Sequence, residues 1–345
     1  MSHEHDTLTG SSRERTAVAE PSDVSPQEGI VVDGVARSFG RVHAVRQASF
    51  TVPHGSITGL VGPNGAGKTT LLLMLATLLR PDSGSIHVAG ADPVTDPVAV
   101  RSHIGWMPDS LGTWSSLSPR TALKTIGRMY GLSAQASRER AAELLDTVGL
   151  TPLADQPARV LSRGQKQRLS LARAIVHSPR VLLLDEPASG LDPVARAELR
   201  TLLRRIADDG AAILVSSHEL AELEEISDAA VYMSAGVTAS SEAVSRAATT
   251  TRQWRIRTLE AAPLVQTLQR IGVAPENIAS DNRGTLVSVT GEADAAQLLS
   301  ALVAAGAPVT SFAPAVGEFE HTFRDLTQSS AAHQHPHPDD SGGAQ

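Results

Sequence analysis

The chain has 345 residues, which is enough for two domains and terminal extensions. Its 41% hydrophobic and 19% charged residues are typical of a globular protein, and its net charge of −7 argues against a broad basic surface, so we expect no nucleic-acid partner. The lack of cysteine excludes disulfides and thiolate metal sites, and the lack of a long apolar run or a signal-peptide pattern predicts a cytoplasmic chain without its own membrane span.

The first part of the chain predicts a polar leader followed by an α/β domain. Residues 1–28 are rich in Ser, Glu and Pro and are expected to be disordered. From 29 to 240, strand-like and helix-like segments alternate. The expected strands are 30–35, 48–52, 56–61, 85–88, 104–108, 181–184, 212–215 and 229–233. The expected helices are 68–79, 119–130, 134–148, 164–177, 193–207 and 219–226.

The later organisation predicts an inserted subdomain and a second, smaller domain. Residues 103–165 are mostly helix-like, as if a helical subdomain interrupts the α/β core. A Ser/Ala/Thr-rich stretch at 241–252 is interpreted as a linker, and the tail 329–345 as disordered. Between them, residues 253–328 predict a small α+β module of ferredoxin type, with strands at 254–257, 278–279, 285–290 and 309–312 and helices at 262–271 and 295–304.

Residues 62–70 read GPNGAGKTT and fit the phosphate-loop pattern G-x-x-x-x-G-K-[ST]. In this pattern, the backbone N–H groups of the loop surround phosphate oxygens, the lysine contacts the β/γ-phosphates, and the hydroxyl after it binds Mg²⁺. The strand-like segment before the loop and the helix-like segment after it provide the context that the pattern requires, so we predict nucleotide binding. The residues involved are Gly62, Pro63, Asn64, Gly65, Ala66, Gly67, Lys68, Thr69 and Thr70.

A second candidate lies at residues 181–187, VLLLDEP, where an apolar strand ends in two acids. A buried strand that delivers a carboxylate beside a phosphate loop can hold Mg²⁺, so Asp185 is the metal candidate together with Thr69. Glu186 could then polarise a water for in-line attack on the γ-phosphate. The alternative for an isolated Asp-Glu pair is a solvated strand end, and the upstream phosphate loop favours the functional interpretation.

Three further motifs occur in a fixed order around this strand: LSRGQ at 161–165, SGLD at 189–192, and a strand ending in Ser-Ser-His at His218. Together with the two motifs above, they resemble the ATP-binding-cassette (ABC) ATPases, and the pattern fits residues 30–240. The resemblance implies a P-loop NTPase with a RecA-like core, an antiparallel β subdomain and an inserted α-helical subdomain. It also implies ATP and Mg²⁺ as cofactors.

The resemblance assigns roles to single positions. It implies that Asp185 is the Walker B carboxylate, Glu186 the catalytic base and His218 the switch histidine that senses the γ-phosphate. Lys68 belongs to the Walker A loop and Asp192 to the D-loop. Phe39 falls where the family places an aromatic ring against adenine, although a lone Phe at a strand end is generally more often part of a core.

The signature motif implies an assembly. In this family Ser162 and Gly164, with Gln165 beside them, reach the γ-phosphate that is bound by the opposite subunit. We therefore expect a homodimer that closes around ATP and opens after hydrolysis.

The chain departs from the family pattern at two positions. Arg163 stands in the signature where a glycine is commoner, and we interpret it as a solvated or subunit-facing charge. Asp109 stands where the Q-loop glutamine is expected, directly after the strand 104–108. Because a carboxylate is a harder, charged ligand, we hypothesise that Asp109 coordinates Mg²⁺ and keeps the coupling role with an altered Mg²⁺ dependence.

Alternating histidines in the C-terminal tail, His333, His335 and His337, could bind a metal. A solvated, unstructured tail is the alternative, because no scaffold fixes the ligands.

The most specific functional hypothesis is the ATPase subunit of a membrane exporter that works through a separate permease. The sequence LATLLRPDSG at 75–84 and the segments SFAP, FE and FRDLT within 311–327 resemble those of exporter ATPases of the drug- and antibiotic-resistance type. The protein would then lie at the inner face of the membrane. The alternatives are a soluble ABC ATPase acting on ribosomes or DNA, and an importer subunit; the single cassette and the negative charge argue against the first.

Overall fold

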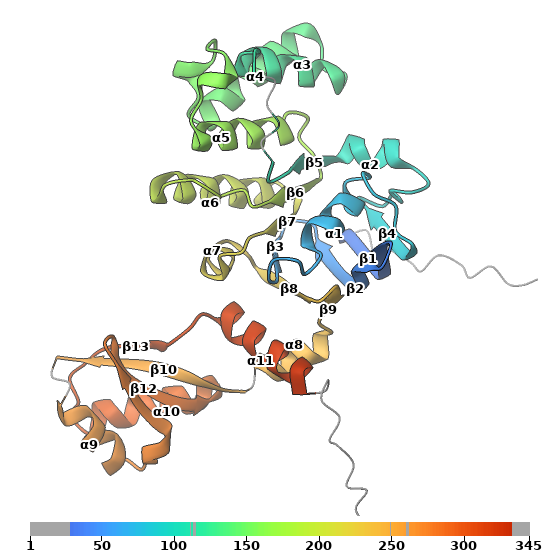
Figure 1. Ribbon diagram of the computed structural model, residues 1–345. Coiled ribbons are helices and arrows are strands. Elements are labelled where there is room, and N and C mark those ends of the chain that lie inside the picture. The colour runs from blue at the N-terminus through green and yellow to red at the C-terminus, as the bar shows by residue number, and fades with distance from the viewer. Residues whose placement is uncertain (1–27, 111, 113–114, 249, 260–261, 333–345) are drawn as a thin grey trace, which may run out of the picture.

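The computed structural model describes residues 28–332 except 111, 113–114, 249 and 260–261. Within these ranges the chain forms an α/β domain and, after it in sequence, a smaller module that lies to one side of it (Figure 1). The expected leader, apart from Glu28, and the tail from residue 333, with its three histidines, lie outside the described residues.

A nine-stranded sheet organises the larger domain, in the order β4-β1-β2-β9-β8-β3-β7-β6-β5. One side of it is antiparallel (β1, β2 and β4), and β8, β3, β7, β6 and β5 run parallel to one another. This confirms the expected core with an antiparallel β subdomain. The bounds are β1 Glu28–Phe39, β2 Val42–Pro53, β3 Ile57–Val61, β4 Ser83–Val88, β5 Ile104–Met107, β6 Val181–Asp185, β7 Ala212–Ser216, β8 Ala229–Ser234 and β9 Val237–Thr238.

Helices cover the parallel strands and build the inserted helical part. The bounds are α1 Lys68–Leu75, α2 Pro97–His103, α3 Pro119–Met129, α4 Ala134–Thr147, α5 Arg163–Ala174, α6 Pro193–Asp208 and α7 Leu220–Ile226. In Figure 1, α3 and α4 lie furthest from the small module, with α5 between them and the sheet. Helix α1 ends before residue 79, the expected end, because Thr77 adopts a left-handed backbone (φ 63°).

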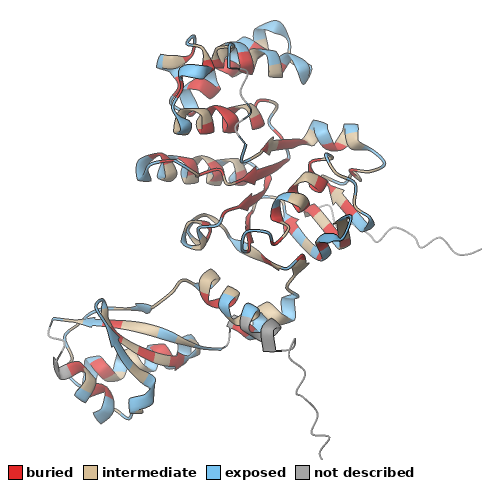
Figure 2. Cartoon of the chain, viewed as in Figure 1, coloured by how far each residue is buried: buried red, intermediate tan, exposed pale blue. Residues whose placement is uncertain are grey.

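The core consists of two apolar clusters on opposite faces of the parallel sheet. Because side chains alternate along a strand, Leu182 and Leu184 of β6 point into one cluster, whereas Val181 and Leu183 point into the other. Strands β3, β6 and β7 are buried along their whole length, which explains why they read as continuous apolar runs (Figure 2). The carboxyl ends of these buried strands carry the candidate site residues.

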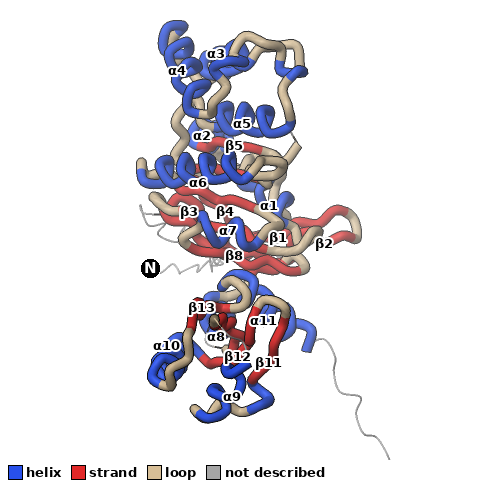
Figure 3. Tube along the Cα trace, turned by 90° about the vertical axis from the view of Figure 1, so that its left-hand side faces the viewer, coloured by secondary structure: helices blue, strands red, loops and turns tan. Residues whose placement is uncertain are grey.

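The small module has the order β10-α9-β11-β12-α10-β13 along the chain and an antiparallel sheet in the order β11-β12-β10-β13. This is the split β-α-β arrangement of the ferredoxin type, which confirms that expectation (Figure 3). Its own core includes Ile256, Val287, Leu264 and Leu302. The bounds are β10 Thr251–Thr258, α9 Ala262–Arg270, β11 Ile278–Asp281, β12 Gly284–Thr290, α10 Gly291–Ala304 and β13 Val309–Pro314.

Two helices that the sequence did not reveal join the module to the larger domain. Helix α8 (Ser241–Ala248) lies in the stretch interpreted as a linker, and α11 (Glu318–Ala332) extends into the first residues of the expected disordered tail. Phe319, Phe323 and Leu326 of α11 pack against the core of the larger domain, where the Phe319 ring meets that of Tyr232 edge to face. The C-terminal helix therefore returns to the α/β domain.

Candidate functional site

The phosphate loop, residues 62–67, connects β3 to α1 as the sequence predicted. Its glycines are required by space and by backbone conformation. A Cβ at Gly62 would collide with the carbonyl oxygen of Met233, and one at Gly67 with that of Ala44. Gly67 also has φ 104°, a value that side chains disfavour, and it is the residue from which α1 starts. The loop can therefore approach a phosphate closely at the positive end of α1.

Lys68 is the first residue of α1 and is 8% exposed. Its ammonium group donates hydrogen bonds to the carbonyl oxygens of Gly62 (2.6 Å) and Pro63 (3.2 Å). Burial lowers the pKa of Lys68, and the nearby Glu186 and Asp185 oppose this shift. A desolvated cation inside the loop is well placed to attract a phosphate group.

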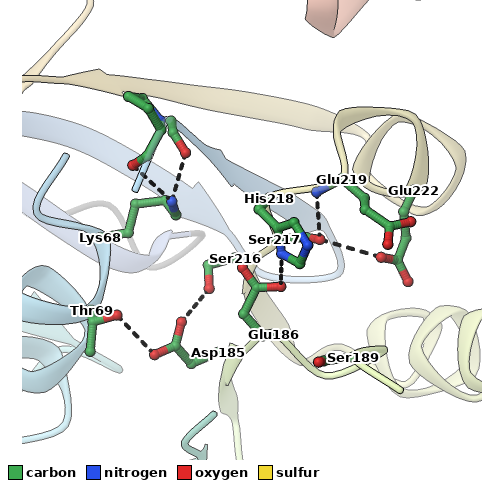
Figure 4. A network of polar contacts seen from close by, with 12 residues as sticks. Lys68, Thr69, Asp185, Glu186, Ser189, Ser216, Ser217, His218, Glu219 and Glu222 are labelled. Carbon is green, nitrogen blue, oxygen red and sulfur yellow. Dashed lines mark hydrogen bonds and ion pairs between the residues drawn. The ribbon is translucent and has the colours of Figure 1, made fainter. Parts of the chain in front are cut away.

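Thr69, Asp185 and Ser216 form a row of oxygens beside the loop (Figure 4). Thr69 Oγ1 donates to Asp185 Oδ2 at 3.1 Å, and Ser216 Oγ donates to Asp185 Oδ1 at 2.5 Å. Asp185 is 4% exposed at the end of β6, and it pairs with Ser216 at the end of β7. Parallel strands that end at the same sheet edge thus bring these side chains together.

The donor set fits the Mg²⁺ that the sequence analysis expected. Thr69 and Asp185 offer oxygen atoms only, which are the ligands that Mg²⁺ prefers, and they lie next to the phosphate loop. Within the described residues there is no cluster of three or more His, Cys, Asp or Glu side chains that could hold a metal. A Mg²⁺ ion bound here would be held by Thr69 and Asp185 together with further oxygen ligands, such as water and a substrate phosphate.

Glu186 directly follows β6 and points toward His218. Its Oε2 lies 2.8 Å from His218 Nδ1, with the two side chains 17% and 57% exposed (Figure 4). The Glu186 backbone is left-handed, with φ 53°, which is uncommon for a residue with a side chain. The sequence predicted both residues but not their direct contact.

One pocket of about 680 Å³ joins most of these residues. Its walls include the loop from Pro63 to Thr70, the two acids Asp185 and Glu186, and Asp109 of the segment after β5. The structure therefore places Asp109 in the same pocket as Lys68, Thr69 and Asp185. The wall from β2 includes Val42, His43 and Ala44, which the sequence analysis did not identify.

The signature residues do not line this pocket. Ser162 caps α5: its hydroxyl accepts from the Gln165 backbone N–H, while the Gln165 side chain accepts from the Ser162 backbone N–H. Ser162 is exposed and Gly164 half-buried at this helix start. Asp192 caps α6, accepting hydrogen bonds from the N–H groups of Ala195 and Val194, which lower the pKa of its carboxyl group.

Phe39 lies at the end of β1, is 45% exposed and does not line the pocket. It pairs across the β1–β2 hairpin with Val42, which does. Because it is exposed to this extent, Phe39 is not a core residue, and the Arg37 guanidinium lies 4.9 Å from the centre of its ring.

Ser216 and Gln167 are site residues that the sequence analysis missed. Ser216 was part of the Ser-Ser-His motif, but its contact with Asp185 depends on the pairing of β6 with β7. Gln167 donates to the Glu186 carbonyl oxygen at 2.8 Å from within α5, and no sequence pattern used above marked it.

The chain is similar in sequence to known ABC transporter ATP-binding proteins. The family model for ABC transporters matches residues 45–189. The chain is 39% identical over 207 residues to the daunorubicin resistance ATP-binding protein DrrA3 of Streptomyces coeruleorubidus, covering 60% of this chain and 66% of that relative, just under two thirds of its length. It is 38% identical over 205 residues to the uncharacterized ABC transporter ATP-binding protein YxlF of Bacillus subtilis strain 168, covering 59% of this chain and 68% of that relative.

A solved structure shares the fold of the larger domain. A bacterial ABC transporter cassette that was solved as a dimer superposes on this chain with a TM-score of 0.58 at 22% identity. The match covers 61% of this chain and 97% of the cassette. None of the helices in the described ranges is long and apolar enough to cross a membrane.

Proposed function

Since this chain belongs to the family of ABC transporter ATP-binding proteins, we propose that it binds and hydrolyses ATP to power export through a separate membrane permease. The observation that carries the proposal is the single pocket that holds Lys68, Thr69, Asp185 and Glu186 together. Purified protein should release phosphate from ATP only when Mg²⁺ is present. A protein that binds ATP but never hydrolyses it, even with its permease, would contradict the proposal.

The chemistry follows from the positions of the side chains. The loop N–H groups and Lys68 hold the phosphates and offset their charge. Glu186 accepts a proton from the water that attacks the γ-phosphorus, while the bond from this phosphorus to the bridging oxygen of ADP breaks. His218, in contact with Glu186, orients the base. Mg²⁺ held by Thr69 and Asp185 would neutralise charge on the β- and γ-phosphates.

Asp109 is proposed as an additional Mg²⁺ ligand because it lies in the pocket wall. Asp109→Ala should raise the Mg²⁺ concentration for half-maximal ATPase activity by about tenfold, since an anionic oxygen ligand is lost. The measurement is a Mg²⁺ titration of phosphate release, with Asp146→Ala on α4 as an exposed control. An unchanged titration and unchanged permease-coupled ATPase activity would exclude this role.

The second proposed partner is another copy of this chain. Because Ser162 and Gly164 stand outside the pocket that holds Lys68, one chain does not complete the composite site that the family resemblance implies. Large apolar side chains are exposed beside both halves: Val42 near the pocket, and Val160 and Val194 near the signature and D-loop. Two antiparallel copies could cover both surfaces, and the structurally similar cassette described above is a dimer.

The transported compound is proposed to be drug-like or hydrophobic. This rests on the similarity to a protein named for daunorubicin resistance, which favours export over the ribosome, DNA and importer alternatives. As a permease-bound subunit, the protein would work at the inner face of the cell membrane.

A second cavity, of about 470 Å³, is the proposed docking groove for the permease. Its exposed apolar side chains are Leu78, Met129 and Tyr130, whose exposed fractions are 58%, 74% and 42%, and its lining also includes Arg101 and Arg173. Trp106, Pro108 and Ser110 line both this groove and the nucleotide pocket, so the segment that carries Asp109 connects them. An apolar cytoplasmic segment of the permease fits such a groove.

Met129→Glu should weaken docking, because it replaces an exposed apolar side chain of the groove with a charged one. We expect at least about tenfold weaker binding to vesicles that contain the permease, which corresponds to about 1.4 kcal/mol. Val98→Glu is the matched control, since Val98 is 69% exposed and lies outside the groove. An equal loss of vesicle binding in both variants, or no loss in either, would argue against this groove as the docking site.

A further inference from the structure

The backbone at Glu186 is held from three sides. Its left-handed conformation (φ 53°) is strained for a residue with a side chain and persists only where the surroundings enforce it. Its N–H donates to the Ser216 carbonyl oxygen at 3.1 Å. Its carbonyl oxygen accepts from Gln167 Nε2 at 2.8 Å and from the Ser189 N–H at 3.2 Å, which uses both of its lone pairs. The contact from Gln167 is the one that comes from a side chain of another element.

Gln167 is 2% exposed, so its amide has exchanged water for this contact. A buried donor that loses its acceptor is costly, and so is a buried acceptor that loses its donor. The bond therefore fixes both partners: α5 at one end and the residue after the Walker B aspartate at the other.

Arg163 makes a second contact from the same helix. It precedes Gln167 by four residues, so the two side chains lie on one face of α5. Its guanidinium donates to Ser189 Oγ at 2.9 Å, and its side chain lies so close to Gly190 that a Cβ there would be 3.0 Å from Arg163 Cδ. Helix α5 thus contacts both ends of the segment 186–190: Gln167 bonds to Glu186 at its start, and Arg163 contacts Ser189 and Gly190 at its end.

The same helix begins with the signature. Ser162 and Gln165 close its N-terminus with reciprocal hydrogen bonds, which makes its first turn rigid. A molecule that contacts the exposed start of α5 therefore contacts a helix that is hydrogen-bonded, through Gln167, to the backbone of Glu186.

We propose that Gln167, supported by Arg163, is a positioning residue for Glu186: it holds the strained backbone that directs the carboxylate into the pocket. This rests on the proposed function, in which Glu186 is the base. Their hydrogen bonds described above go to Ser189 and Glu186, and neither residue lines the nucleotide pocket, so we expect an effect on the rate of hydrolysis and not on ATP affinity. A chain with glycine at this signature position would lack the hydrogen bond that Arg163 donates to Ser189.

The test is Gln167→Met, which keeps the length of the side chain and removes the donor. We expect kcat for ATP to fall about 10- to 100-fold, as small misplacements of a catalytic group do. The KM for ATP should stay within twofold, and the ATP-bound dimer should accumulate, as we also expect for Glu186→Gln. Arg163→Ala should lower kcat less, Arg163→Lys should restore it in part, and Arg159→Ala, at an exposed arginine upstream, is the control.

The outcomes separate this proposal from the proposed function. If Gln167→Met has the wild-type kcat while Glu186→Gln is inactive, the positioning role is overturned and the proposed ATPase function stands. A loss of ATP binding or of dimer formation together with kcat also overturns it, because the effect is then structural. If Gln167→Met does not fold, the variants Arg163→Ala and Arg163→Lys, at an exposed position, decide: equal kcat in wild type and both variants overturns the proposed positioning role. An inactive wild type with its permease contradicts the proposed function itself.

Discussion

Replacing Glu186 by glutamine is expected to lower kcat for ATP hydrolysis by about 10²- to 10⁴-fold, the usual contribution of a general base. Glutamine keeps the size of the side chain and cannot accept the proton of the attacking water. The backbone contacts to Ser216 and Gln167 do not involve the carboxylate and should remain. ATP binding should therefore be preserved, so a single-turnover assay should give slow hydrolysis at full ATP occupancy.

Glu198→Gln is the matched control, because Glu198 is exposed on α6 and does not line the nucleotide pocket. It should hydrolyse ATP like the wild type. Glu186→Gln with more than a tenth of wild-type kcat would show that another group takes the proton.

Replacing Lys68 by alanine is expected to weaken ATP binding and to lower hydrolysis by about 10²- to 10³-fold, the effect of losing one preorganised donor to developing charge. Lys68 is buried, and its pKa is lowered by burial, so its charge acts in a poorly screened environment. The variant also leaves the carbonyl oxygens of Gly62 and Pro63 without this donor. Equilibrium titration with a fluorescent ATP analogue measures the binding, and phosphate release measures the rate.

Lys124→Ala on α3 is the control for loss of a lysine away from the pocket. If Lys68→Ala bound ATP as tightly as the wild type and kept its kcat, the phosphate loop would not have the role proposed for it.

Local patterns made most of the α/β domain predictable. The phosphate loop needs only neighbouring residues, since glycines, Lys68 and Thr69 follow one buried strand and open one helix. The buried parallel strands were readable as apolar runs because both of their faces are covered. Asp185 and Glu186 were found because they end such a strand.

Contacts between distant segments were not predictable. The bond from Ser216 to Asp185 requires β7 to pair with β6 in one register, and the bond from Gln167 to Glu186 requires α5 to lie against the end of β6. Neither requirement leaves a periodic signal. The left-handed backbone at Thr77, which ends α1 early, likewise occurs at a residue type that gives no warning of it.

Helices α8 and α11 were missed for a related reason. The Ser/Ala-rich composition of α8 resembles a linker, and the helix is stabilised by packing against α11. In α11, Phe319, Phe323 and Leu326 recur at helical spacing, but only the fold shows that they cover the core of the larger domain. A tail can be recognised as a helix once the surface that it covers is known.

The central claim is that one copy supplies the phosphate loop and another supplies Ser162 and Gly164 to a shared ATP. Sedimentation of Glu186→Gln with and without ATP tests it most directly, because slow hydrolysis preserves the bound nucleotide. We predict a mass near 36.1 kDa without ATP, twice that value with ATP, and no dimer when Ser162→Arg is added. A protein that stays monomeric with saturating ATP, also in the presence of permease-containing vesicles, would contradict the account.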